Sequence, residues 1–174
     1  MANSYSDFSL SFSHVVNPKV ESGSHYEHQD ILSLEGFELA NKEITSWNNY
    51  KPTPLHSFDD MASETGVSSI FYKDENPRFT LKSFKALGGA YAVANFLIKQ
   101  LKEEGINANS SDLIRGTYRD QTSKLTVCCA TDGNHGRSVA WGAQQFGCNC
   151  EIYIPVSYTH LRAHETRGNL VCRR

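Results

Sequence analysis

Residues 124–155 carry the pattern that most limits how this chain can fold. The apolar run KLTVCCA is followed by the loop TDGNHG, the amphipathic segment RSVAWGAQQFG and a second apolar run, CEIYIP. Apolar runs of about four to eight residues are typical of buried strands, and the segment between them has helical length and spacing. A strand, a helix and a strand joined by short loops form a βαβ unit with parallel strands. The sequence therefore predicts an α/β fold.

The longest helical pattern lies upstream, between residues 83 and 105. Ser83 is the expected N-cap, which places Lys85 in the first turn, where the helix dipole disfavours a positive charge. The helix is expected to end in KEEG, whose Gly105 is the expected residue after the C-cap. Apolar residues at intervals of three and four predict a buried stripe made of Phe84, Leu87, Tyr91, Ala94, Ile98 and Leu101.

Two adjacent glycines, Gly88 and Gly89, lie inside this predicted helix. Each helical glycine costs about 1 kcal/mol relative to alanine, so bare backbone here should serve a purpose. Together with Ala92 they leave the face that begins at Lys85 almost without side-chain bulk. A flat ligand held by the lysine is one interpretation. The other is close packing against a second helix, with the lysine merely solvated.

The loop TDGNHG, residues 131–136, is a second candidate site. It follows a predicted strand and precedes a helix, at the carboxyl end of a parallel sheet, where α/β proteins bind ligands. Backbone N–H groups at a helix N-terminus bind carboxylate or phosphate. Asn134 offers an amide to a phenolate oxygen, and Asp132 offers a base. The alternative is an ordinary turn in which Asp132 only caps the helix.

The remaining patterns predict shorter elements. A helix is expected around Phe37, Ala40, Ile44 and Trp47, and it should end at the prolines of KPTPL. SIFYKD is a candidate apolar strand, and ENPRF is a turn. INANSSDLIRGTYRDQTS is a polar connection that carries a helical turn.

Charge limits the classes of partner. The 174 residues contain 17 Lys and Arg against 19 Asp and Glu, a net charge of −2 with both signs interspersed. There is no basic stripe for nucleic acid, no signal-like leader, and no run near the roughly 18 apolar residues of a membrane span. We expect a cytoplasmic protein whose partner is a small molecule rather than nucleic acid or a membrane.

The five cysteines predict neither a metal site nor a disulfide scaffold. Their number is odd, and no C-x-x-C spacing occurs. Cys128 and Cys129 are neighbours in a predicted strand, so their side chains point to opposite faces and cannot share one ion. We expect small buried thiols, no metal, and a solvated pair at His25 and His28.

Three motifs follow one another along the chain: KPTPLHSF, FYKDENPRFTLKSFKALGGAYA and CCATDGNHGRSVAWGAQQFGCNCEIYIP. Together they resemble the fold-type II pyridoxal-phosphate enzymes of the tryptophan synthase β-like group, and within it the ammonia-lyases of 2,3-diaminopropionate. The resemblance covers residues 45–155. It implies a partial, truncated fold-type II fold built from parallel βαβ units, with pyridoxal 5'-phosphate as the cofactor.

The resemblance also implies roles for particular residues. Lys85, in SFK, matches the lysine that holds the cofactor as a Schiff base and then removes the Cα proton. Asn134 matches the asparagine beside the cofactor's 3-hydroxyl. Asp132 matches a second base, which removes the proton from the D-isomer of the substrate. The loop that grips the substrate carboxylate corresponds to Thr131, Asp132, Gly133, Asn134, His135 and Gly136.

The implied reaction is the α,β-elimination of 2,3-diaminopropionate to pyruvate and ammonia, in a parent enzyme that is a homodimer. The sequence departs from the ammonia-lyase pattern at Thr80, Lys82 and Ser83, where glycine, asparagine and alanine are common. SFK also occurs in serine and threonine dehydratases. A dehydratase and a non-catalytic small-molecule-binding module therefore remain as alternatives.

We interpret the chain as three segments. Residues 1–30 are expected to be a poorly ordered leader, and residues 31–155 the N-terminal part of a catalytic domain. Residues 156–174, VSYTHLRAHETRGNLVCRR, resemble translated sequencing-adapter sequence rather than protein. The chain itself is expected to be inactive, because the family's phosphate-binding glycine loop and the partner of the pyridine nitrogen are missing.

Overall fold

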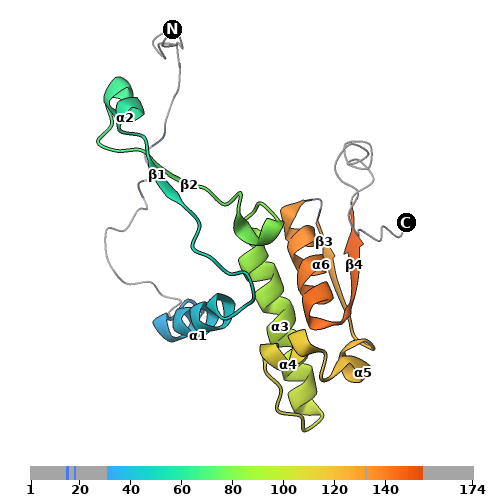
Figure 1. Cartoon of the computed structure of the whole chain (residues 1–174). Coiled ribbons are helices and arrows are strands. Elements are labelled where there is room, and N and C mark those ends of the chain that lie inside the picture. The colour runs from blue at the N-terminus through green and yellow to red at the C-terminus, as the bar shows by residue number, and fades with distance from the viewer. Residues whose placement is uncertain (1–14, 16–17, 19–30, 132, 155–174) are drawn as a thin grey trace.

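The computed structural model of the chain describes Val15, Pro18, residues 31–131 and residues 133–154. The predictions for His25, His28, Asp132 and residues 156–174 therefore lie outside the described residues, as does nearly all of the predicted leader. Figure 1 shows the arrangement of the described elements.

The predicted βαβ unit is present. It consists of β3 (Thr126–Ala130), α6 (Asn134–Phe146) and β4 (Asn149–Tyr153), and the two strands are parallel, with Cys129 opposite Ile152. The pairing continues past β3, where the Thr131 amide donates to the Tyr153 carbonyl at 3.0 Å. These strands confirm the α/β class and the parallel sheet.

The long helix, α3 (Lys85–Glu103), lies beside α6, as Figure 1 shows. Gly105 follows its C-cap with φ +81°, as predicted. The predicted buried stripe is partly wrong, because Phe84 is 62% exposed and precedes the helix. The small residues Gly89 and Ala90 face α6, since they allow the two backbones to approach. The buried face is Ala86, Gly89, Ala90, Val93, Ala94, Leu97 and Leu101.

The polar connection after α3 carries two short helices, α4 (Ser110–Arg115) and α5 (Arg119–Thr122). Asn109 and Asp112 form a capping box at the start of α4, which satisfies amide donors at both ends of the pair. The prediction of a helical turn here is confirmed, and the structure adds a second one.

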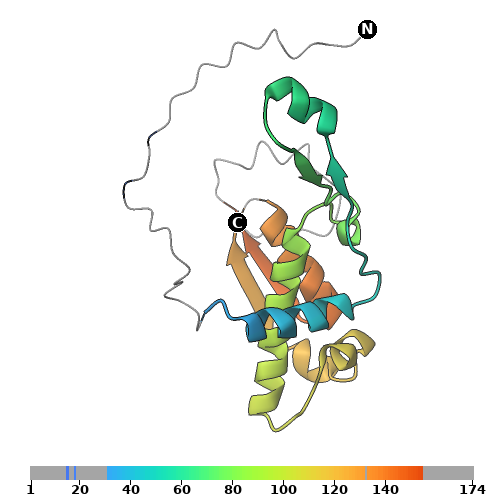
Figure 2. The same cartoon turned by 90° about the vertical axis from the view of Figure 1, so that its left-hand side faces the viewer.

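The N-terminal helix, α1 (Leu34–Thr45), is capped by Ser33, whose hydroxyl accepts from the Gly36 amide at 2.9 Å. Figure 2 shows it crossing α3. The predicted face is only partly right, because Phe37 is 62% exposed. Trp47, predicted within the same stripe, lies after the helix. It is buried in an aromatic cluster with Phe79, Trp141 and Phe146.

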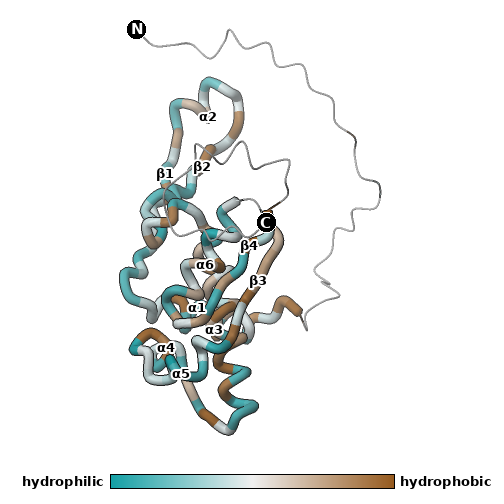
Figure 3. The backbone as a smooth tube through the Cα atoms, turned by 90° about the vertical axis from the view of Figure 1, so that its right-hand side faces the viewer, coloured by the Kyte–Doolittle hydropathy of each residue, from teal (hydrophilic) through white to brown (hydrophobic). Residues whose placement is uncertain are grey.

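Strands β1 (Leu55–Ser57) and β2 (Phe71–Lys73) form an antiparallel ribbon, and α2 (Asp59–Thr65) connects them. The strand predicted in SIFYKD is confirmed as β2, but it is not buried: every residue of both strands is exposed. Figure 3 shows apolar residues in the segment between α2 and β2. An apolar run predicts a strand, whereas its burial needs a second surface, which the described residues do not provide.

The four cysteines among the described residues are less buried than predicted. Cys128 is exposed and Cys129 is half-buried, so the two lie on opposite faces of β3 as expected. Burial raises the pKa of the Cys148 thiol to about 11 and also raises the pKa values of Cys129 and Cys150. Within residues 31–131 and 133–154, no group of three or more His, Cys, Asp or Glu is placed to hold a metal ion.

Candidate functional site

Lys85 is the first residue of α3, and its side chain is exposed. Phe84 rather than Ser83 occupies the N-cap position, so the helix begins one residue later than predicted. Ser83 nevertheless serves the first turn, because its hydroxyl accepts from the Lys85 amide at 3.2 Å and its carbonyl accepts from the Ala86 amide at 3.2 Å. The prediction that Lys85 lies in the first turn is therefore correct.

The segment before Lys85 has an unusual backbone. Phe79, Thr80 and Lys82 have φ values of +44°, +63° and +57°, in the left-handed region that favours glycine and asparagine. Thr80 and Lys82 are two of the positions at which the resembled family commonly has glycine and asparagine. ENPRF forms the predicted turn, and the short 3₁₀-helix η2 (Arg78–Thr80) completes it.

The loop TDGNHG begins where β3 ends, and α6 begins inside it, at Asn134. The Asn134 and His135 side chains are exposed, and Asn134 Oδ1 accepts from Arg137 Nη1 at 3.3 Å. Gly136 is buried, and a Cβ on it would lie 2.8 Å from Thr131 Cγ2 and 3.1 Å from Ile152 Cγ2. Gly136 therefore allows the amino end of α6 to sit against the carboxyl ends of both strands.

The amino ends of α3 and α6 lie together. Ser138, one turn into α6, donates a hydrogen bond from Oγ to the Lys85 carbonyl at 2.5 Å. Further along, Gly142 packs against Ala90, where an added Cβ would lie 2.8 Å from the Ala90 Cα. The two helices therefore run side by side in the same direction. Lys85 and Asn134, predicted from separate motifs, are brought to the same end of the fold.

The two glycines of α3 have different environments. A Cβ on Gly89 would lie 2.8 Å from the Ser138 Cβ and 3.3 Å from the Val139 amide nitrogen, whereas a Cβ on Gly88 would meet nothing within 4 Å. Close helix packing therefore explains Gly89. The interpretation of a bare face beside the lysine applies to the exposed Gly88 alone.

This difference predicts opposite effects of two neighbouring substitutions. Gly88→Ala is expected to stabilise the fold by up to about 1 kcal/mol, because alanine is the better helix former and has free space. Gly89→Ala is expected to destabilise it by about 1–3 kcal/mol, because the new methyl group overpacks Ser138. Urea unfolding of both variants measures the difference. Equal effects of the two changes would contradict the assigned packing.

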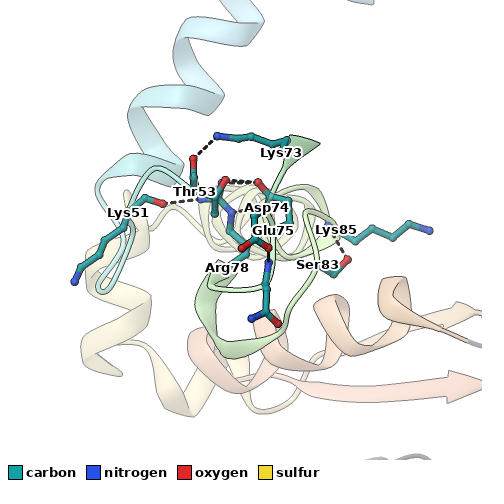
Figure 4. A network of polar contacts seen from close by, with 9 residues as sticks. Lys51, Thr53, Lys73, Asp74, Glu75, Arg78, Ser83 and Lys85 are labelled. Atoms are coloured by element: carbon teal, nitrogen blue, oxygen red, sulfur yellow. Dashed lines mark hydrogen bonds and ion pairs between the residues drawn. The ribbon is translucent and has the colours of Figure 1, made fainter. Parts of the chain in front are cut away.

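A buried polar cluster precedes the lysine segment and was not predicted from the sequence. Arg78 is 5% exposed, and its guanidinium binds Glu75 with Nε–Oε2 at 2.8 Å and Nη2–Oε1 at 3.0 Å. It also donates to the Lys51 carbonyl at 3.0 Å and to Thr53 Oγ1 at 3.1 Å. Figure 4 shows the cluster, with the Lys85 side chain pointing away from it. The sequence predicts a helix end at KPTPL and a turn at ENPRF, but the contact between these two segments depends on tertiary structure.

The cluster predicts a pH dependence of stability. Hydrogen bonds from Arg78 hold the pKa of Glu75 below its usual range, against the opposing effect of burial. A carboxyl with a lowered pKa in the fold contributes stability at neutral pH, and this contribution is lost as the pH falls through the folded-state value. Unfolding free energies from about pH 7 to 3 should therefore decline more steeply in the wild type than in Glu75→Gln. Parallel profiles would contradict this assignment.

A lysine beside the amino end of a second helix, at the carboxyl ends of parallel strands, defines a candidate site for an anionic carbonyl compound in an α/β protein. None of the described helices has the length and apolar character needed to cross a membrane. The comparison with known families agrees with this class: the sequence model of the family described as "Pyridoxal-phosphate dependent enzyme" matches residues 47–168. The chain belongs to the family of pyridoxal-phosphate dependent enzymes.

Individual relatives are similar to this chain over most of its length. A diaminopropionate ammonia-lyase of Escherichia coli K12 is 46% identical over 129 residues, which are 74% of this chain and 31% of the relative. A second one, from Salmonella typhimurium, is 38% identical over 68% of this chain and 30% of its own length. The crystal structure of the holo E. coli ammonia-lyase superposes with a TM-score of 0.63 and 40% identity, covering 75% of this chain and 32% of that one. The predicted fold-type II class is confirmed, and the chain spans about a third of these relatives.

Proposed function

We propose that this chain is the lysine-bearing part of a pyridoxal-phosphate dependent ammonia-lyase that acts on 2,3-diaminopropionate. The observation that carries the proposal is the placement of Lys85 and Asn134 at the adjoining amino ends of α3 and α6. Both curated relatives described above are diaminopropionate ammonia-lyases, which supports this substrate.

The residues present fit the cofactor. Gly88 leaves open space one turn after Lys85, and the amino ends of two helices favour anionic oxygens. In this proposal Lys85 would hold the cofactor covalently through its amine, and Asn134 would hold the cofactor's 3-hydroxyl through its side-chain amide. When bound, pyridoxal phosphate supplies an electron sink for the negative charge that develops at the substrate's α-carbon.

The chain's own residues bind the substrate and move its proton. Lys85 takes the proton from the α-carbon, acting as a positioned base. Backbone N–H groups of Gly133, Asn134, His135 and Gly136, with the Thr131 hydroxyl, bind the substrate carboxylate at the start of α6. Asp132 is proposed as a second base, for the D-isomer. We also propose that the full-length protein is a cytoplasmic homodimer.

Substrate comparison tests the proposal. In the full-length gene product, ammonia and pyruvate release from both enantiomers of 2,3-diaminopropionate should exceed release from serine and threonine. The 174-residue chain alone is expected to release neither product. Faster turnover of serine or threonine would instead identify a dehydratase. A full-length protein that binds no cofactor would identify a non-catalytic binding module.

A further inference from the structure

Ser138 connects the two helices that carry the candidate site. Its side chain is 0% exposed, and its hydroxyl donates to the Lys85 carbonyl at 2.5 Å across 53 positions of the chain. A peptide carbonyl has two lone pairs, so the Lys85 carbonyl can accept this bond in addition to a helical one. The contact therefore joins α6 directly to the peptide unit of the lysine.

The neighbouring glycine makes this contact possible. Gly89 lies one turn after Lys85 on α3, and a Cβ there would come within 2.8 Å of the Ser138 Cβ. Asn134 lies one turn before Ser138 on α6. Lys85 and Asn134 are thus the first residues of α3 and α6, and Gly89 and Ser138 lie one turn further along these helices, where they contact each other.

We propose that Ser138 is a positioning residue: its hydroxyl fixes the first turn of α3 to α6 and thereby sets the position of Lys85 relative to Asn134. The significance of Lys85 rests on the function proposed above. The hydrogen bond itself does not, and the two are tested separately.

The hydrogen bond can be observed at one peptide group, because Lys85–Ala86 is the only Lys–Ala pair in the sequence. Labelling the 174-residue chain with ¹³C-carbonyl lysine and ¹⁵N-alanine gives one carbonyl-to-amide cross-peak for this peptide. Ser138→Ala should move its carbonyl resonance upfield and speed hydrogen exchange at the Ala86 amide. Ser110→Ala, at a buried serine of α4, is the matched control and should change neither.

A double variant separates the hydroxyl from packing. Gly89→Ala combined with Ser138→Gly places the methyl group on the other helix and removes the donor. Its unfolding free energy should recover relative to Gly89→Ala alone, while the Lys85 carbonyl resonance stays displaced as in Ser138→Ala. A resonance that returns to its wild-type position would overturn the assignment to the hydroxyl.

The position of the lysine is measured by its reactivity. The full-length gene product is incubated with pyridoxal phosphate and reduced with borohydride, and the Lys85 adduct is quantified against those on Lys82 and Lys99. Ser138→Ala should lower the Lys85 share several-fold, and Ser110→Ala should leave it unchanged. An unmoved carbonyl resonance, or an unchanged Lys85 share, would overturn the proposal. Equal labelling of all three lysines in the wild type would count against the proposed function, while the Ala86 exchange rate still decides the role of Ser138.

Discussion

Replacing Lys85 with alanine is expected to abolish covalent attachment of pyridoxal phosphate and to reduce ammonia release by at least about 10³-fold in the full-length gene product. The same side chain is proposed to hold the cofactor and to take the substrate proton, and a positioned base alone contributes about 10²–10⁴-fold. The visible absorbance of the bound cofactor and the rate of ammonia release measure the two roles. Alanine suits the first turn of α3, so the helix should remain intact.

Lys99 provides the matched control for this result. It is an exposed lysine of the same helix, remote from the amino end at which Lys85 and Asn134 meet. Lys99→Ala should keep both the absorbance band and the activity. A band that survives in Lys85→Ala would remove Lys85 from its proposed role, and an equal loss in Lys99→Ala would show that the effect is not specific to the site.

The elements with a strong local pattern could be predicted from the sequence. The βαβ unit, α1 and α3 follow from periodicity, and the stop at Gly105 follows from its preference for positive φ. The face that α3 buries could not be predicted in this way. Hydropathy favours large apolar residues, whereas the close contact with α6 selects small ones at Gly89 and Ala90.

In the candidate site, too, local sequence patterns predict some features, whereas others depend on tertiary packing. Lys85 and Asn134 were found because each lies at a recognisable helix start that follows a turn or a strand. Their proximity follows from the packing of α3 on α6, which no local pattern encodes. Gly89 was noticed, but its partner is Ser138, a small polar residue whose importance depends entirely on what lies opposite it.

Replacing Arg78 with methionine is expected to destabilise the fold by up to about 3–5 kcal/mol, because it leaves the half-buried Glu75 carboxylate without its ion-pair partner. Glu75 has a side chain only 16% exposed, and the Thr53 hydroxyl and the Lys51 carbonyl would lose a donor at the same time. Urea unfolding of Arg78→Met measures the loss. Arg115 supplies the control, since its ion pair with Asp112 lies on the surface, with the arginine side chain 66% exposed. Arg115→Met should cost less than about 1 kcal/mol.

A second comparison separates the buried charge from the volume of the side chain. Arg78→Met with Glu75→Met removes both charges, so much of the lost stability should return, as it does when buried ion pairs are replaced by apolar residues. Equal losses in Arg78→Met and Arg115→Met would contradict the burial on which this prediction rests. The cluster matters for the site because the strained residues Phe79, Thr80 and Lys82 lie one, two and four positions after Arg78. Residues held at positive φ persist only where their surroundings fix them, and the Arg78 contacts fix the start of the segment that leads into Lys85.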